Sequence, residues 1–207
     1  IEGLEAFAQQ EIARAGGQSL STKPGVIHFT FSADPRKLLT LKTVLSVYAA
    51  RSFNVPRPKA LLGDQHLRAL LALVDDAAGI AGRNAYRTFM LGAAGADSAI
   101  MQRIKTEIAR HTRLSEVAED GDLLVRLFPS GESWLALVRI SPKPLGTRAW
   151  RECVTPGALQ ATVAHVMAGL TQPKPNDVVL NVCCGSGTLL IERGLLAPAQ
   201  RLIGCDI

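Results

Sequence analysis

The sequence contains few cysteines, few aromatic residues and no long apolar run. Its four cysteines, Cys153, Cys183, Cys184 and Cys205, form no CxxC pair, so neither a disulfide framework nor a zinc site is expected. No apolar run approaches the roughly 18 residues that a membrane-spanning helix needs. Ile1–Glu5 lack the basic start and the apolar stretch of a cleavable signal peptide. We therefore expect a cytoplasmic protein with reduced thiols, no bound metal and no membrane anchor.

The totals of length and charge leave several classes of protein open. A length of 207 residues suits one large domain or two smaller ones. The net charge of +5 and the isoelectric point near 9.3 allow a polyanionic partner but do not by themselves indicate one. The order of the apolar patterns along the chain is more informative.

Proline-containing stretches at 51–59 and 141–146 separate segments with different apolar patterns. Residues 1–57 predict a small α+β unit, and Gly16-Gly17 ends its first helix. The expected elements are a helix over 4–15, a strand over 26–31, a short helix opened by Asp34, and a second strand over 44–53. We take this segment as the N-terminal domain.

Residues 60–142 predict a second α+β unit in the order helix, strand, helix, hairpin. The expected elements are helices beginning at Asp64 and Asp97 and strands over 86–91, 123–127 and 134–140. Ile100, Ile104 and Ile108 are spaced four apart and predict the buried face of the second helix.

Residues 143–153 are expected to form a linker, and residues 154–207 to begin an α/β domain. The expected elements there are a helix over 156–170, an apolar strand over 178–183, a helix over 187–196 and a strand over 201–205. A β–α–β unit implies parallel strands joined by a right-handed crossover. The first of these strands is mostly apolar, as in strands that are buried on both faces.

A glycine turn, Cys184–Thr188, lies between this strand and the helix that follows it. Open α/β sheets bind ligands at such a position, and the helix N-terminus there favours a negative group. Asp206 lies 21 positions after Gly185, at the end of the next strand. A carboxylate in this place can accept hydrogen bonds from both ribose hydroxyls of an adenosine cofactor. A bare turn with incidental glycines is the alternative, and the surrounding strand, helix and acid disfavour it.

The position of the third glycine separates two classes of cofactor. Dinucleotide sites have a glycine three positions after the second one, where helix and strand pack closely. Here Leu190 stands at that position. An adenosine cofactor that ends in an amino acid is therefore favoured over a nicotinamide dinucleotide, and an oxidoreductase is the less favoured hypothesis.

At these residues the chain resembles the Rossmann-fold methyltransferases of RNA guanine, whose motif is roughly Asp-Pro-x-Cys-Gly-Ser-Gly-Thr. The segments 144–151 and 156–162 resemble the lead into that domain in THUMP-containing methyltransferases. Residues 60–142 are similar in order to the THUMP module, and residues 1–57 to the ferredoxin-like domain before it. The implied fold class is two α+β units followed by the start of a Rossmann-like α/β domain.

The resemblance implies S-adenosyl-L-methionine (SAM) as the cofactor, held by one set of residues. These are Pro156, Asn181, Cys184, Gly185, Ser186, Gly187, Thr188 and Asp206. The family usually has Asp where this chain has Asn181, and that acid is thought to face the methionine ammonium. An asparagine keeps the acceptor but loses the charge, and charge-assisted hydrogen bonds are about twice as strong as neutral ones.

The resemblance also implies an activity, the formation of N2-methylguanosine in tRNA. The family's catalytic motif follows the fourth strand of the sheet, so we expect it beyond Ile207 and expect this chain to be an inactive fragment of an enzyme. Ribosomal RNA as the substrate remains an alternative. So does a non-catalytic RNA-binding protein with a degenerate methyltransferase domain, to which Asn181 points.

Basic residues are concentrated between positions 83 and 113, with only Asp97 and Glu107 as acids among them. These basic residues are Arg83, Arg87, Arg103, Lys105, Arg110 and Arg113. Arg103 and Arg110 lie two helical turns apart, away from the apolar face, and could contact phosphates. A solvated helix surface is the alternative. The THUMP resemblance favours RNA binding, because that module implies contact with the acceptor end of tRNA.

Overall fold

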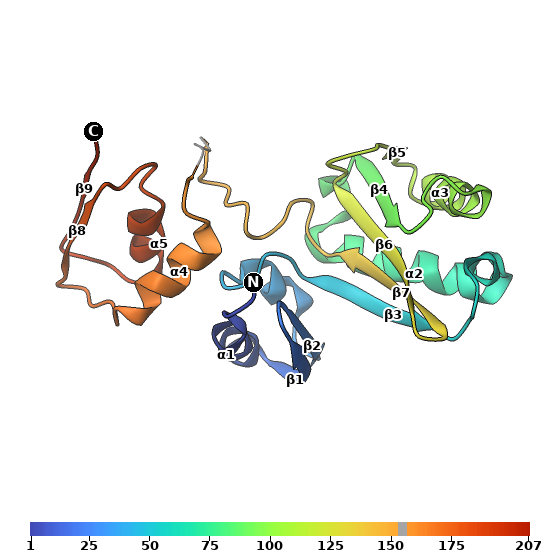
Figure 1. Ribbon diagram of the computed structural model, residues 1–207, viewed down its shortest axis with the longest axis horizontal. Helices are drawn as coiled ribbons and strands as arrows, with labels where there is room; N and C mark the ends of the chain where they lie inside the picture. The colour runs from blue at the N-terminus through green and yellow to red at the C-terminus, as the bar shows by residue number, and fades with distance from the viewer. Residues whose placement is uncertain (153–156) are drawn as a thin grey trace. The chain divides into compact units, whose positions relative to one another are not determined.

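The computed structural model describes residues 1–152 and 157–207. The chain divides into two compact units; Figure 1 labels the helices and strands of both. One unit combines the two ends of the chain, Ile1–Leu45 and Leu145–Ile207, and the other consists of Ser46–Pro144. The second unit is thus inserted in sequence within the first.

The N-terminal part of the first unit has four elements. They are α1 (Glu5–Ala15), β1 (Gly17–Lys23), β2 (Val26–Phe31) and the 3-10 helix η1 (Pro35–Thr40). Gly16 ends α1 in the left-handed conformation, with φ of 105°, and the Asp34 carboxylate caps η1 by accepting a hydrogen bond from the backbone N–H of Arg36. The helix, the strand β2 and the short helix are confirmed. Strand β1, which pairs antiparallel with β2, was not predicted because its sequence is polar and exposed.

The domain boundary predicted after residue 57 is wrong. Strand β3 (Tyr48–Phe53) pairs antiparallel with β7 (Ser133–Arg139) along its whole length, from Tyr48 opposite Arg139 to Phe53 opposite Trp134. The strand therefore belongs to the second unit, and the boundary lies at Leu45. A partner strand more than 80 residues later in the chain does not affect the local apolar pattern. That pattern therefore groups β3 with the preceding elements of the N-terminal domain.

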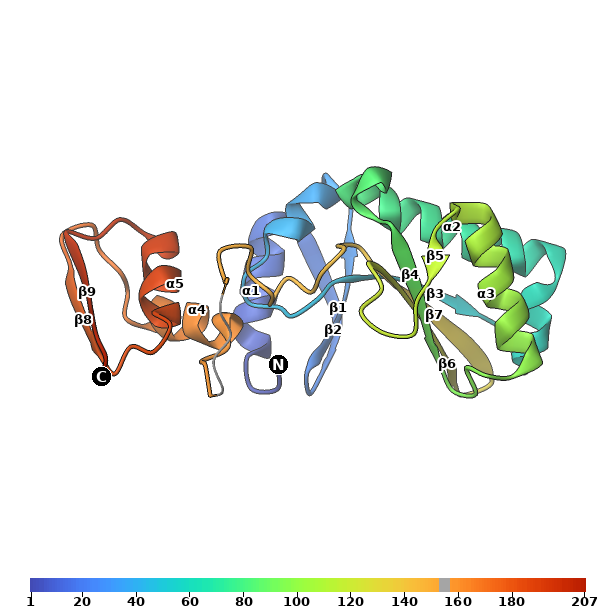
Figure 2. The same ribbon diagram turned by 90° about the horizontal axis from the view of Figure 1, so that it is seen from above.

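The second unit is a five-stranded sheet in the order β3-β7-β6-β4-β5. Its further elements are η2 (Pro58–Leu62), α2 (Asp64–Ala81), η3 (Arg83–Ala85), β4 (Thr88–Ala93), α3 (Ala99–Thr112), β5 (Ser115–Glu116) and β6 (Leu123–Ser130). Strand β4 runs parallel to β5 and β6, and β6 and β7 form the predicted hairpin. Helix α2 packs on β3 and β7 and helix α3 on β4 and β5, both on the same side of the sheet (Figure 2).

The core of the second unit lies between α2, α3 and this face of the sheet. Phe89, Ile104, Ile108 and Leu127 are fully buried. Ile100, which was predicted to share the buried face of α3, is only half-buried, and Met101 is buried with Ile104 and Ile108 instead.

The C-terminal part of the first unit is the predicted β–α–β unit with one helix before it. Its elements are α4 (Ala161–Leu170), β8 (Val178–Val182), α5 (Thr188–Leu196) and β9 (Arg201–Cys205). Strands β8 and β9 are parallel, as expected, and α4 packs against α5. Helix α4 begins at Ala161 rather than near residue 156, and residues 153–156 lie outside the described part of the chain.

The expectation that β8 is buried on both faces is wrong for this chain. Val178, Leu180 and Val182 are 59, 59 and 65% exposed. Helix α5 covers the other face of the two-stranded sheet, and among the described residues nothing covers the face that carries these three side chains. None of the helices that the structure describes is long and apolar enough to cross a membrane.

Candidate cofactor-binding site

The glycine turn joins the ends of the two parallel strands. The backbone N–H of Cys184 donates to the carbonyl oxygen of Cys205 at 2.9 Å. One residue later, the N–H of Gly185 donates to the carboxylate of Asp206. The N–H of Gly187 then donates to the carbonyl of Cys184 at 2.9 Å, which closes the turn. The structure thus brings together the turn and the acid that the sequence placed 21 residues apart.

The turn depends on backbone conformations that side chains rarely adopt. Cys183, Gly185 and Gly187 have φ of 60°, 53° and 73°, and Gly187 is the N-cap residue of α5. A β-carbon on either glycine would meet no atom within 4 Å. The glycines are therefore required by the left-handed backbone, and the space beside them is open to a ligand at the helix N-terminus.

A glycine on the strand replaces the missing third glycine on the helix. A β-carbon on Gly204 of β9 would lie 2.8 Å from the sulfur of Cys184 and 2.9 Å from Cδ1 of Leu190. The leucine side chain of α5 thus packs onto bare strand backbone. Close packing of helix and strand is kept, although the dinucleotide pattern is absent.

The other predicted cofactor residues lie in or next to the turn. Thr188, the first residue of α5, is 3% exposed, whereas Ser186 and Asp206 are exposed. The Ser186 and Thr188 hydroxyl oxygens are 3.1 Å apart. Asn181 is half-buried on β8, opposite Gly204 in the strand pairing. Pro156 lies outside the described residues.

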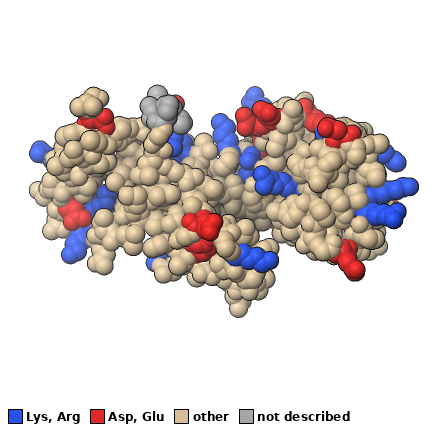
Figure 3. Space-filling model, viewed as in Figure 1, with Lys and Arg blue, Asp and Glu red and all other residues tan. Residues whose placement is uncertain are grey.

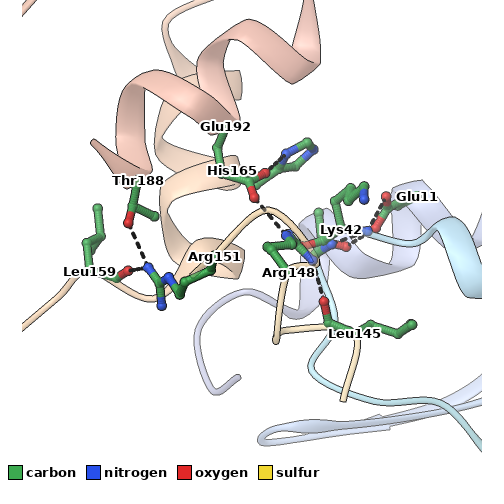
Figure 4. A network of polar contacts seen from close by, with 10 residues as sticks. Glu11, Lys42, Leu145, Arg148, Arg151, Leu159, His165, Thr188 and Glu192 are labelled. Carbon is green, nitrogen blue, oxygen red and sulfur yellow. Dashed lines mark hydrogen bonds and ion pairs between the residues drawn. The ribbon is translucent and has the colours of Figure 1, made fainter. Parts of the chain in front are cut away.

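Two arginines of the linker contact α5, and neither was predicted (Figure 4). Nη2 of Arg151 donates to the Thr188 hydroxyl at 2.7 Å and to the carbonyl of Leu159 at 2.6 Å. Nε of Arg148 donates to the Glu192 carboxylate at 2.7 Å. The signal in the sequence is Glu192 itself. A charged residue within the apolar segment of α5 indicates a buried partner.

Glu192 is the centre of a buried polar network. Its second oxygen lies 2.7 Å from Nδ1 of His165 on α4, and its own side chain is completely buried. Burial by itself would raise the pKa of the Glu192 carboxyl. The hydrogen bonds and charges of His165 and Arg148 outweigh burial and leave this pKa below its ordinary value. The carboxylate is therefore ionised and fully partnered.

The network continues into the N-terminal part of the same unit. Besides Glu192, Arg148 donates to the carbonyls of Leu145 at 2.6 Å and of Lys42 at 2.8 Å. The carboxylate of Glu11 on α1 accepts from the backbone N–H of Lys42 at 2.8 Å. The two ends of the chain are thus held together through one buried guanidinium.

Three of the six predicted RNA-binding residues are engaged in ion pairs. Lys105 pairs with Glu116 at 2.8 Å and is 11% exposed, Arg110 pairs with Glu107 at 2.5 Å, and Arg83 with Asp75 at 3.3 Å. Asp75 and Glu116 lie outside residues 83–113, a segment with only two acids of its own, and the fold brings both next to its basic residues. Figure 3 shows acidic and basic side chains interspersed on the visible face.

The other three basic residues are exposed and available for a partner. Arg87, Arg103 and Arg113 make no ion pair with another residue in the described part of the chain. Arg103 lies on α3, and Arg113 caps its C-terminus with φ of 60°. The predicted stripe of Arg103 and Arg110 is therefore reduced to one unpaired guanidinium.

Cys183, Cys184 and Cys205 are free thiols. Within residues 1–152 and 157–207, no three His, Cys, Asp or Glu side chains are grouped in a way that could hold a metal ion.

One comparison with known proteins falls on the turn and on the segment before it. Residues 148–203 match the family model of the RMKL-like methyltransferase domain. A tRNA (guanine(10)-N2)-dimethyltransferase of Methanocaldococcus jannaschii is 42% identical over 57 residues, which are 28% of this chain and 16% of that protein. The U6 snRNA (guanine-N(2))-methyltransferase THUMPD2 of Bos taurus is 36% identical over 64 residues, 31% of this chain and 12% of that protein.

Two solved structures share the fold over almost the whole chain. TrmN from Thermus thermophilus has a TM-score of 0.64 at 16% identity, over 99% of this chain and 62% of that one. SMU.472, solved in complex with S-adenosylhomocysteine (SAH), has a TM-score of 0.62 at 15% identity, over 94% of this chain and 53% of that one. The chain thus spans less than two thirds of the proteins that it resembles.

The segment that contains the glycine turn therefore matches a methyltransferase domain, and one solved structure of the same fold holds SAH. Both relatives are named as guanine-N2 methyltransferases of RNA, and this chain covers 16 and 12% of their lengths.

Proposed function

We propose that this chain carries the cofactor-binding and RNA-holding parts of an enzyme that forms N2-methylguanosine in tRNA. The observation that carries the proposal is the bond from the Gly185 N–H to Asp206, which sets an open glycine turn and a carboxylate side by side. Two relatives of this chain are named as guanine-N2 methyltransferases of RNA. Because the chain spans 62% of TrmN and 53% of SMU.472, the proposal concerns the full-length enzyme.

The residues of the turn have distinct roles in this proposal. Asp206 accepts hydrogen bonds from the ribose hydroxyls, and the backbone at Gly185 and Gly187 lets the cofactor approach closely. Asn181 supplies an uncharged acceptor toward the methionine end. The bound cofactor contributes an electrophilic sulfonium methyl group. The catalytic residues that hold the guanine amine are expected after Ile207, in the remainder of the enzyme.

Calorimetry with SAH on the full-length protein tests the cofactor site. We expect saturable binding with one site per chain and no competition by NAD, because Leu190 occupies the place of the third glycine. An absence of heat at millimolar SAH would disprove the cofactor assignment. Displacement of SAH by NAD would instead support a dinucleotide enzyme.

A non-catalytic RNA-binding protein is the second candidate, and Asn181 is the observation that favours it. Loss of the acidic partner weakens recognition of the methionine ammonium. The same calorimetry combined with a methyl-transfer assay on tRNA separates the two. SAH binding with methyl transfer supports the enzyme, whereas RNA binding without either supports the degenerate domain.

The exposed arginines of the second unit are proposed to contact RNA phosphates near the acceptor end of tRNA. We expect that Arg87→Gln and Arg103→Gln each weaken tRNA binding about 3- to 10-fold and each lower the salt slope of log K by about 1. Fluorescence anisotropy of labelled tRNA over a range of KCl concentrations measures both quantities.

Arg68→Gln is the matched control for these two variants. It removes the same charge from an exposed arginine that is already paired with Asp64 on α2. Weakening by Arg68→Gln equal to that by Arg103→Gln would show that only net charge matters and would contradict a specific contact surface.

A further inference from the structure

Arg151 is bonded to the residue that ends the cofactor turn. One nitrogen, Nη2, donates to both the Leu159 carbonyl and the Thr188 hydroxyl, at 2.6 and 2.7 Å. Thr188 follows Gly187 directly and is 3% exposed. Its side chain is therefore fixed from the inside of the unit, while the glycines before it face open space.

The linker that carries Arg151 is itself fixed at a second point on the same helix. Arg148 binds Glu192, which lies four residues after Thr188 on α5. Residues four apart share one face of a helix, so the two arginines hold one side of α5 at points one turn apart (Figure 4). The Arg151 guanidinium also stacks over the Trp150 ring, 5.6 Å from its centroid, which restricts its freedom further.

The turn needs such support because its own backbone is weakly restrained. Glycine samples more conformations than any other residue, and two of the five residues of Cys184–Thr188 are glycines. A turn that is ordered before binding loses less conformational entropy when the ligand arrives. A rigid anchor at Thr188 acts on the N-terminus of α5, where the ligand would be held.

We propose that Arg151 is a positioning residue for the cofactor. It holds the Thr188 hydroxyl and so orders the turn Cys184–Thr188 before the cofactor binds, and the Arg148–Glu192 pair keeps the linker in reach. This inference rests on the proposed cofactor site and assigns a role to a residue outside the glycine motif. Arg151 acts through Thr188 and does not itself touch the cofactor.

A double-mutant cycle in the full-length protein tests the proposal, with the dissociation constant of SAH measured by calorimetry. We expect Arg151→Ala and Thr188→Val each to raise this constant about tenfold. The double variant should be no more than about twofold worse than either single one, because both changes break the same contact. Thr188→Ser keeps the hydroxyl and should restore most of the affinity. The affinity for tRNA should stay within about twofold.

Each possible result bears on one claim. Arg14→Ala, which removes an exposed arginine from the last turn of α1, serves as the control and should leave the SAH constant unchanged. If Arg151→Ala binds SAH like the wild type, or if the two single effects multiply in the double variant, the positioning role is wrong. If the wild-type protein does not bind SAH, the proposed function fails instead. Should Arg151→Ala not fold, the SAH dissociation constants of Thr188→Val, which is nearly isosteric with the wild type, and Thr188→Ser are compared instead. Equal constants for these two variants would show that the positioning role is wrong.

Discussion

Replacing Glu192 by alanine is expected to lower the free energy of unfolding of the first unit by about 3 to 5 kcal/mol. The side chains of Glu192 and Arg148 are 0 and 2% exposed, so the truncation leaves a guanidinium charge buried without its counterion. It also removes the partner of His165. A buried ion pair is weak evidence of net stabilisation, but removal of one partner is costly because the remaining charge stays desolvated.

Urea unfolding followed by tryptophan fluorescence measures this loss in the correct unit. The chain has two tryptophans, Trp134 in the second unit and Trp150 in the first. A Trp134→Phe background therefore leaves one reporter, in the same unit as Glu192. Glu2→Ala, at an exposed position of the same unit, is the control and should change stability by no more than about 0.5 kcal/mol. A loss below about 1 kcal/mol for Glu192→Ala would contradict a buried, fully desolvated pair.

The pH dependence of stability has a definite sign at this residue. The pKa of Glu192 is lower in the folded state than its ordinary value, so its contribution is present above the ordinary glutamate pKa of about 4.3. That contribution is lost as the pH falls through the lower folded pKa. Glu192→Gln keeps the volume and lacks this titration, so the difference in stability between wild type and variant should shrink below about pH 4. A difference that grows on acidification would contradict the assignment.

Replacing Asp206 by alanine is expected to weaken SAH binding about 100-fold, equivalent to about 2.7 kcal/mol. The carboxylate would accept from the ribose hydroxyls, and hydrogen bonds to a charged group contribute about 1.5 to 3 kcal/mol each. The variant also leaves the Gly185 N–H without its partner, so the turn becomes less ordered. Asp206→Asn keeps one acceptor oxygen and should lose only about tenfold.

Calorimetry with SAH on the full-length protein measures both Asp206 variants. Asp120→Asn is the matched control, because Asp120 is exposed and has a φ of 53° that asparagine tolerates. The control should bind SAH like the wild type. If the SAH dissociation constant of Asp206→Ala is within threefold of the wild-type value, Asp206 is not part of the cofactor site.

The sequence predicted the features that depend on neighbours along the chain. The glycine turn, the parallel strands around it and the cap of Asp34 follow from local patterns, and the structure contains each of them. The family resemblance is supported by the match at residues 148–203. The proposed roles of Asn181 and Asp206 toward the cofactor remain predictions.

The features that the sequence did not predict depend on contacts between distant segments. Strand β3 was misassigned because its partner β7 lies in another part of the chain. The contacts of Arg148 with Glu192 and of Arg151 with Thr188 span 44 and 37 residues, and nothing in the composition of the linker indicates them. The basic surface was overestimated for the same reason, since Glu116 reaches Lys105 only in the folded unit.

The interleaved order of the two units has a consequence for synthesis on the ribosome. Arg148 binds the carbonyl of Lys42, 106 residues earlier in the chain, so the first unit cannot close until its second half has been made. At about 5 to 20 residues per second, the N-terminal segment waits on the order of 5 to 20 seconds for that contact. The second unit is contiguous and can fold during this delay. In nascent chains of this protein, the second unit should therefore fold before the first unit.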